Sequence, residues 1–193
     1  MVRYMSITIL IFNMLGCTKT YKLTADDLKL NPYKGGEILV FNSNQGETDT
    51  IFVLEVRKHK ARIDPLSTVP QFKEKLEVVV QYTNPIAYGG KEERDKDIFF
   101  DLSTGENGDI SLGFRPKAKN AWFYSPNGYS RDQFEKLPIS KLATKKYEYD
   151  DVIKLEPDMR FYDRETFVAM VYWSKSKGYV RYDLKNGVYW ELQ

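Results

Sequence analysis

The feature that most restricts the fold is an alternation of apolar and polar residues that recurs along the chain between turn signals. Side chains that alternate in this way have the period of a β-strand with one buried face. Leu76, Val78, Val80 and Tyr82 form one such apolar row, and Asn84-Pro85 ends it. Turn signals at short intervals favour antiparallel strands over parallel strands joined by helices.

Several of these rows are spaced as hairpins, in which a short polar loop joins two strands. The paired ranges are residues 37–43 with 49–58, 97–102 with 109–115, and 178–184 with 188–192. In the first pair, Phe52, Leu54 and Val56 are expected to share one face. Residues 166–173 are apolar on both faces, which predicts a central strand.

Helices are expected to be few and short. Thr24-Ala-Asp-Asp27 and Ser130-Arg-Asp-Gln133 both have the pattern of a capped helix start, but a proline follows each within a few residues. We therefore expect eight to ten strands in a mainly β domain, an antiparallel sandwich or barrel-like sheet with one to three short helices. No repeat or composition break divides the chain after residue 36, so residues 36–193 are expected to form a single domain.

The amino terminus has the composition of an export signal. Arg3 gives a short positive segment, and residues 6–15 are mostly apolar but too few to cross a bilayer. The segment ends in Met14-Leu15-Gly16-Cys17. Residues 1–16 are therefore predicted to be a signal peptide, and residues 17–35 a tether and lead-in.

Gly16 followed by Cys17 resembles the lipobox of bacterial lipoproteins. The resemblance implies cleavage before Cys17, a diacylglycerol on its sulfur and an acylated amino group. Thr18 in place of Asp implies the outer membrane, and the absence of a following acidic cluster implies the periplasmic face. Two alternatives stay open: residues 6–12 as a buried strand of a cytoplasmic protein, or an ordinary secretory signal with Cys17 incidental.

Charge and cysteine content limit the remaining function classes. The formal net charge is +2 and falls to +1 without residues 1–16, so a nucleic-acid partner is not expected. Cys17 is the single cysteine, which excludes an internal disulfide and a cysteine metal cluster. The sequence indicates no cofactor.

Catalytic signatures are scarce. His59 is the single histidine and lies in a cationic run, where a solvated position is expected. The segment from Asp101 to Asp109 is expected to be a hairpin turn rather than a calcium loop. Acids gather near the penultimate loop, so a carboxylate-dependent hydrolase is kept as the less favoured alternative. These acids are Asp150, Asp151, Glu156, Asp158, Asp163 and Glu165.

Aromatic residues of the carboxy-terminal strands are the candidate binding residues. They are Tyr172, Trp173, Tyr179, Tyr182, Tyr189 and Trp190. On the surface they would stack on a glycan or anchor an envelope protein, and inside a barrel they would enclose an apolar ligand. The alternative is that they fill a β core and its cross-strand pairs.

Residues 31–36, 178–183 and 186–190 resemble uncharacterised envelope lipoproteins of Bacteroidota-type bacteria, a group that implies no activity. We therefore expect a non-catalytic binding or interaction module, held at the membrane through acyl chains on Cys17. The alternative is a carrier or sensor of an apolar small ligand within the sheet.

Overall fold

The computed structural model describes residues 18–66, 70–83, 86–88, 91–93, 96–118, 121–123, 128–157 and 167–193. The predicted signal peptide and Cys17 lie outside the described residues, as do Asp158, Asp163 and Glu165.

Most of the described chain is β-strand. The strands are β1 (Lys19–Tyr21), β2 (Ile38–Ser43), β3 (Thr48–Arg62), β4 (Gln71–Tyr82), β5 (Ile86–Tyr88), β6 (Lys91–Glu93), β7 (Asp97–Thr104), β8 (Ile110–Phe114), β9 (Lys117–Ala118), β10 (Ala121–Trp122), β11 (Tyr129–Ser130), β12 (Ile139–Ala143), β13 (Glu148–Leu155), β14 (Val168–Ser174), β15 (Gly178–Leu184) and β16 (Tyr189–Leu192). This is more than the eight to ten expected, because the expectation omitted the short pairs and the β12–β13 hairpin.

Two helices occur in the described part of the chain, α2 (Ala25–Leu28) and α3 (Arg131–Glu135), and each is about one turn long. Both begin with the capping box that the sequence predicts. The Thr24 hydroxyl accepts from the backbone N–H of Asp27, and the Ser130 hydroxyl accepts from that of Gln133. The caps satisfy amide groups that helices this short leave unbonded.

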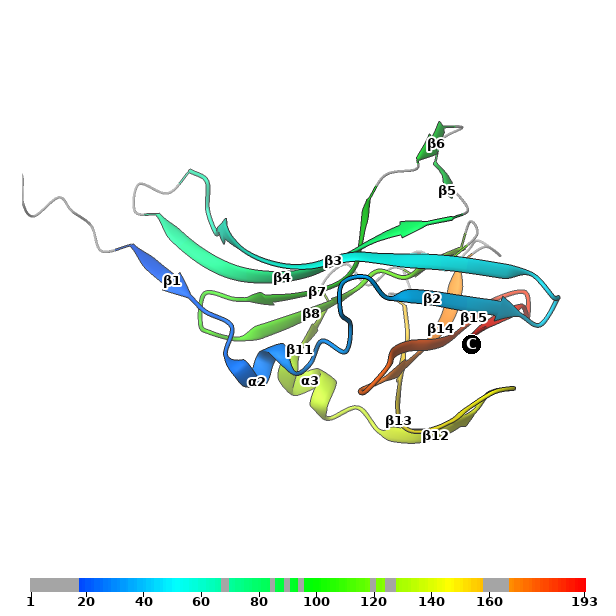
Figure 1. Ribbon diagram of the computed structural model, residues 1–193. Coiled ribbons are helices and arrows are strands. Elements are labelled where there is room, and N and C mark those ends of the chain that lie inside the picture. Colours follow the sequence, from blue (N-terminus) through cyan, green and yellow to red (C-terminus); the bar gives the residue numbers. More distant parts are fainter. Residues whose placement is uncertain are drawn as a thin grey trace, which may run out of the picture.

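One curled antiparallel sheet organises the molecule (Figure 1). Its strand order is β11-β8-β7-β4-β3-β2-β16-β15-β14-β13-β12, with β1 added in parallel beside β4. All three predicted hairpins are present, and β14 has a neighbour on each side, as expected for a central strand. The mainly β fold class is therefore confirmed, in the form of a half-barrel with two short helices among the described residues.

Aromatic side chains fill the concave side of the curl. The Trp173 ring of β14 lies 4.9 Å, centroid to centroid, from each of Phe100, Phe114 and Tyr179. Because β7 and β8 are far from β14 in the strand order, these contacts join the two halves of the sheet. The helix α3 adds Phe134, which stacks on Phe114.

The lead-in before β2 also contributes to this core. Leu23 and Tyr33 are buried, and the Tyr33 hydroxyl accepts a hydrogen bond from the backbone N–H of Tyr179 at 2.8 Å. This approach depends on Gly178, whose φ is +80° and where a Cβ atom would lie 2.1 Å from the Tyr33 oxygen. A side chain at position 178 would therefore displace the tyrosine.

Phe52, Leu54 and Val56 do not share one face as expected, because a β-bulge interrupts the alternation in β3. Val53 pairs with Val80 but Glu55 pairs with Val79, so Leu54 is an extra residue in β3. The bulge puts Val56 on the core side with Ile51 and Val53, whereas Leu54 remains 36% exposed. Simple alternation fails here because one inserted residue reverses the faces.

Candidate functional site

The structure separates the six candidate aromatic residues into two groups. Trp173, Tyr179, Tyr182 and Trp190 are buried, each 2% exposed or less. Tyr172 and Tyr189 lie on the opposite face of the same strands and are partly exposed. The four buried rings fill the core, so Tyr172 and Tyr189 are the two members of the set that a partner can reach.

Tyr179 and Arg181 show how the sheet sorts these side chains. On a regular strand, Tyr179 and Arg181 would point to the same face, because they are separated by one residue. In the structure Trp173 pairs with Tyr179 while Tyr172 pairs with Arg181, so Val180 is an extra residue in β15. The bulge turns Tyr179 into the core and leaves Arg181 on the outer face.

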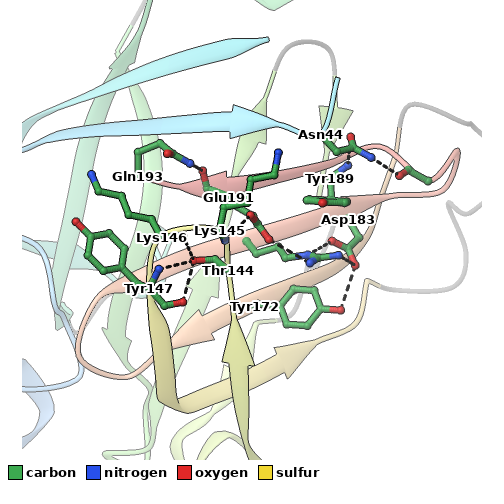
Figure 2. Close-up of polar contacts among 12 residues, drawn as sticks. Asn44, Thr144, Lys145, Lys146, Tyr147, Tyr172, Asp183, Tyr189, Glu191 and Gln193 are labelled. Atoms are coloured by element: carbon green, nitrogen blue, oxygen red, sulfur yellow. Dashed lines mark hydrogen bonds and ion pairs between the residues drawn. The ribbon is translucent and has the colours of Figure 1, made fainter. Parts of the chain in front are cut away.

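Arg181 is the centre of the outer face. Its guanidinium carbon lies 4.0 Å from the ring centroid of Tyr189 and 5.4 Å from that of Tyr172, two rings that Figure 2 labels. Its Nε donates to Asp183 at 2.6 Å, and its Nη1 donates to Glu191 at 3.2 Å. These contacts place the guanidinium over both tyrosine rings, where cation–π attraction adds to the ion pairs.

The charges of this cluster are mutually stabilised. Burial opposes the charge on Arg181, but hydrogen bonding and proximity to Asp183 raise its pKa above the usual value. Burial first, and then the Asp183 carboxylate, raises the pKa of the Tyr172 phenol. The Tyr172 hydroxyl therefore stays protonated and donates to Asp183 at 3.1 Å. Because the Tyr172 hydroxyl stays neutral and is already hydrogen-bonded, it supports the outer face structurally and does not act as an acid or base.

Glu191 joins this cluster to the tip of the β12–β13 hairpin. One of its carboxylate oxygens accepts from Arg181, and the other accepts from the backbone N–H of Lys145 at 3.3 Å. Thr144 closes the tip, because its hydroxyl accepts from the backbone N–H of Tyr147 and donates to the Tyr147 carbonyl, both at 3.0 Å. Figure 2 shows Glu191 between Lys145 of the tip and Asp183, the other carboxylate that Arg181 contacts. The tip is thus fastened to β16.

A groove of about 410 Å³ lies beside this attachment. Its lining comes from the first half of β13, the β14–β15 turn and the last residues of the chain: Tyr147, Glu148, Tyr149, Asp150, Asp151, Ser176, Lys177, Leu192 and Gln193. Tyr147 is 45% exposed, and its ring contacts that of Tyr149 at 6.2 Å. Burial first, and then Tyr147, Glu191 and Asp151, raise the pKa of Tyr149, so its phenol remains neutral. The groove combines two aromatic rings with an excess of carboxylates.

Asp151 supports one wall of the groove. Its carboxylate accepts from the Ser174 hydroxyl at 2.7 Å and from the backbone N–H of Ser176 at 2.8 Å. Burial acts to raise its pKa, but these hydrogen bonds outweigh burial and lower the pKa below its usual value. Asp151 therefore stays ionised and orders the β14–β15 turn, while Glu148 and Asp150 are exposed to solvent.

The sequence predicted Asp150 and Asp151 near a loop, and the structure places both within strand β13, which also contains Glu148. Glu148 and Asp150 are two residues apart on that strand, a spacing that puts both on one face. The groove was missed because its walls come from three distant segments. Tyr147 and Tyr149 are also two residues apart, and this pair of aromatic residues was the sequence signal that could have indicated the groove.

The other candidate residues do not gather into a site. His59 lies on β3 with its Nδ1 3.9 Å from Glu77, and Glu156 is exposed at the end of β13. The segment from Asp101 to Asp109 forms the end of β7 and the turn to β8, as predicted. Within the described residues, no group of three or more histidine, cysteine or acidic side chains is placed to hold a metal ion. None of the helices in this part of the chain is long and apolar enough to span a membrane.

Comparison of the chain with protein-family models, curated proteins and solved structures finds no match.

Proposed function

We propose that this protein is a lipid-anchored lipoprotein of the bacterial cell envelope, attached through Cys17, that binds a partner without catalysing a reaction. The observation that carries the anchor is the Gly16-Cys17 pair directly after a short apolar segment with Arg3 at its start. Several acyl chains on one residue, at about 0.8 kcal/mol per buried methylene, hold a protein at a bilayer without a membrane-spanning helix. On this proposal the mature chain faces the periplasm from the outer membrane.

Metabolic labelling with palmitate tests the anchor. The wild-type chain is expected to incorporate label and to fractionate with membranes, whereas Cys17→Ser incorporates none. Thr18→Ser is the matched control, because it changes the neighbouring hydroxyl residue and keeps the sulfur. A wild-type chain that takes up no label overturns the anchor.

The partner site in this proposal is the groove between the β12–β13 tip and the end of the chain. The single observation that carries it is the combination of the exposed Tyr147 with three carboxylates against one lysine along the lining. Carboxylates attract a cationic group, and tyrosine rings contact cations and flat apolar surfaces favourably. The expected partner is a protein segment that carries a lysine or arginine side chain, and a glycan is the alternative outcome.

Packing of the interior supports a surface site over a ligand carried inside the sheet. The side chains of Phe100, Phe114, Trp173 and Tyr179 are each 1% exposed or less and contact one another across the curl. Rings packed at these distances occupy the region where an enclosed apolar ligand would lie. The proposal therefore assigns recognition to the outer face.

Photo-crosslinking in intact cells tests the location of the partner site. A photoreactive amino acid at position 147 is expected to capture a protein, and the same residue at position 106 in the β7–β8 turn serves as control. Equal capture from both positions contradicts the groove. Capture of carbohydrate at position 147, in place of protein, selects the glycan alternative.

A further inference from the structure

The long β3–β4 hairpin concentrates positive charge at one end of the molecule. Residues 19–22, 57–66 and 70–77 together form what we call the basic arm. It holds eight basic residues, namely Lys19, Lys22, Arg57, Lys58, Lys60, Arg62, Lys73 and Lys75, against the three acids Asp64, Glu74 and Glu77. The whole chain has a net charge of only +2, so this excess is local.

Part of this charge is neutralised within the arm. Glu77 pairs with Arg57 at 2.7 Å, and Glu74 pairs with Lys58 at 2.8 Å. Lys60 and Lys73 form no ion pair with any described residue, and Lys60 is exposed. Their positive charge is therefore available to an anion outside the protein.

The chain enters the fold at the same end. Lys19 of β1 pairs in parallel with Gln71 of β4, close to the hairpin turn (Figure 1). Cys17 is two residues before Lys19, and consecutive Cα atoms are 3.8 Å apart, so the two Cα atoms are within about 8 Å of each other. A lipid on Cys17 thus brings the arm to the bilayer surface.

The hairpin turn carries an apolar side chain outward. Leu66 is 90% exposed, the largest exposure among the exposed large apolar residues of the described chain. Ile63 and Pro65 flank it in sequence. Exposed apolar residues bordered by lysine and arginine match the interface of a membrane, where side chains enter the headgroup layer and cations meet lipid phosphates.

We propose that the basic arm lies against the anionic headgroups of the membrane and fixes the orientation of the protein on it. This inference rests on the proposed anchor at Cys17, and it adds a second contact that the acyl chains alone do not supply. It also has a consequence for the groove. In Figure 1, β1 lies at the left of the molecule and the carboxy terminus, whose last residues line the groove, lies toward the right, so the arm holds the groove away from the bilayer.

Vesicle sedimentation tests the arm separately from the lipid. The protein is residues 17–193 with Cys17→Ser, which retains every residue of the core cluster, from Leu23 to Trp190. The probes are vesicles of phosphatidylcholine alone and vesicles that also contain phosphatidylglycerol. Binding is expected to be about tenfold or more tighter to the anionic vesicles, because basic residues near an anionic surface are attracted to it. Raising the salt concentration from about 0.05 M to about 0.5 M is expected to remove most of this binding.

Charge reversal identifies the residues. Lys60→Glu combined with Lys73→Glu is expected to lower binding to anionic vesicles by about tenfold or more. Lys141→Glu combined with Lys175→Glu gives the same change in net charge away from the arm and is expected to bind within about twofold of the starting protein. Circular dichroism on each variant confirms that it folds, and Leu66→Ser provides a variant without charge change, expected to bind more weakly.

Equal binding to both kinds of vesicle would overturn the proposal that the basic arm contacts the membrane. An equal loss of vesicle binding in the two charge-reversed proteins would overturn it as well. Palmitate labelling separates this result from the anchor. Label on the wild type together with no preference for anionic vesicles rejects the arm and keeps the anchor. No label together with a clear anionic preference rejects the anchor and keeps the arm.

Discussion

The two faces of strands β14 to β16 carry aromatic residues in opposite environments, four of them buried and two partly exposed. On the concave face, Trp173 and Tyr179 are closed off from solvent by other rings. On the outer face, Tyr172 and Tyr189 lie in partial contact with solvent beside Arg181. The comparison indicates that burial, rather than the residue type, separates aromatics that hold the fold from those that support a surface.

Trp173→Ala is expected to have the largest effect on stability. It removes a ring that contacts Phe100, Phe114 and Tyr179, and it leaves a cavity where the two halves of the sheet meet. Loss of a buried tryptophan costs about 3 to 5 kcal/mol of unfolding free energy. Urea unfolding followed by circular dichroism measures the change. A loss below about 1 kcal/mol would mean that the core does not depend on this contact.

Arg181→Ala tests the outer face and is expected to cost about 2 kcal/mol. The cost arises because Glu191 is only 4% exposed and would lose its charged partner. Arg181→Lys keeps the charge but not the flat guanidinium, so it is expected to recover only part of the loss. The same urea titration measures both variants. Full recovery by lysine would show that stacking between the tyrosine rings contributes little.

Tyr179→Phe and Tyr182→Phe form a matched pair inside the core. The Tyr179 hydroxyl donates to the Phe99 carbonyl at 2.9 Å and accepts from the backbone N–H of Arg115 at 3.1 Å, so its removal is expected to cost about 1 kcal/mol. The Tyr182 hydroxyl is buried without a hydrogen-bond partner among the described residues. Its removal is expected to be neutral or slightly stabilising. Comparable losses in the two variants would contradict this difference.

Acid sensitivity at Asp151 is the smallest expected effect. Its pKa in the folded protein lies below the ordinary value of 3.8, because hydrogen bonds from Ser174 and Ser176 outweigh burial. A carboxylate with a lowered folded pKa stabilises the fold above about pH 4, and this contribution disappears as the pH falls further. Asp151→Asn is therefore expected to flatten the fall in Tm between about pH 5 and about pH 2.5. An unchanged slope would assign the acid sensitivity to other carboxylates.

The sequence predicted most of the sheet because its hairpins have clear alternation and glycine turns. It missed the β12–β13 hairpin, where β12 has no buried residue and the first half of β13 is exposed or half-buried, so neither gives a clear apolar row. It also treated Tyr172 and Trp173 as one set, although neighbours on a strand point to opposite faces. That rule was available from the sequence. The bulge at Val180 was not, because its position depends on the pairing of two strands.

Charge reversal in the groove tests the central claim, that the outer face recognises a partner while the inner face holds the fold. Glu148→Lys combined with Asp150→Lys changes two exposed acids of the lining, and Glu106→Lys combined with Asp109→Lys changes two exposed acids of the β7–β8 turn. Capture by a photoreactive residue at position 147 is the measurement. The groove variant is expected to lose capture with an unchanged Tm, whereas the turn variant is expected to retain capture. Equal capture by both variants would show that the groove acids do not recognise the partner.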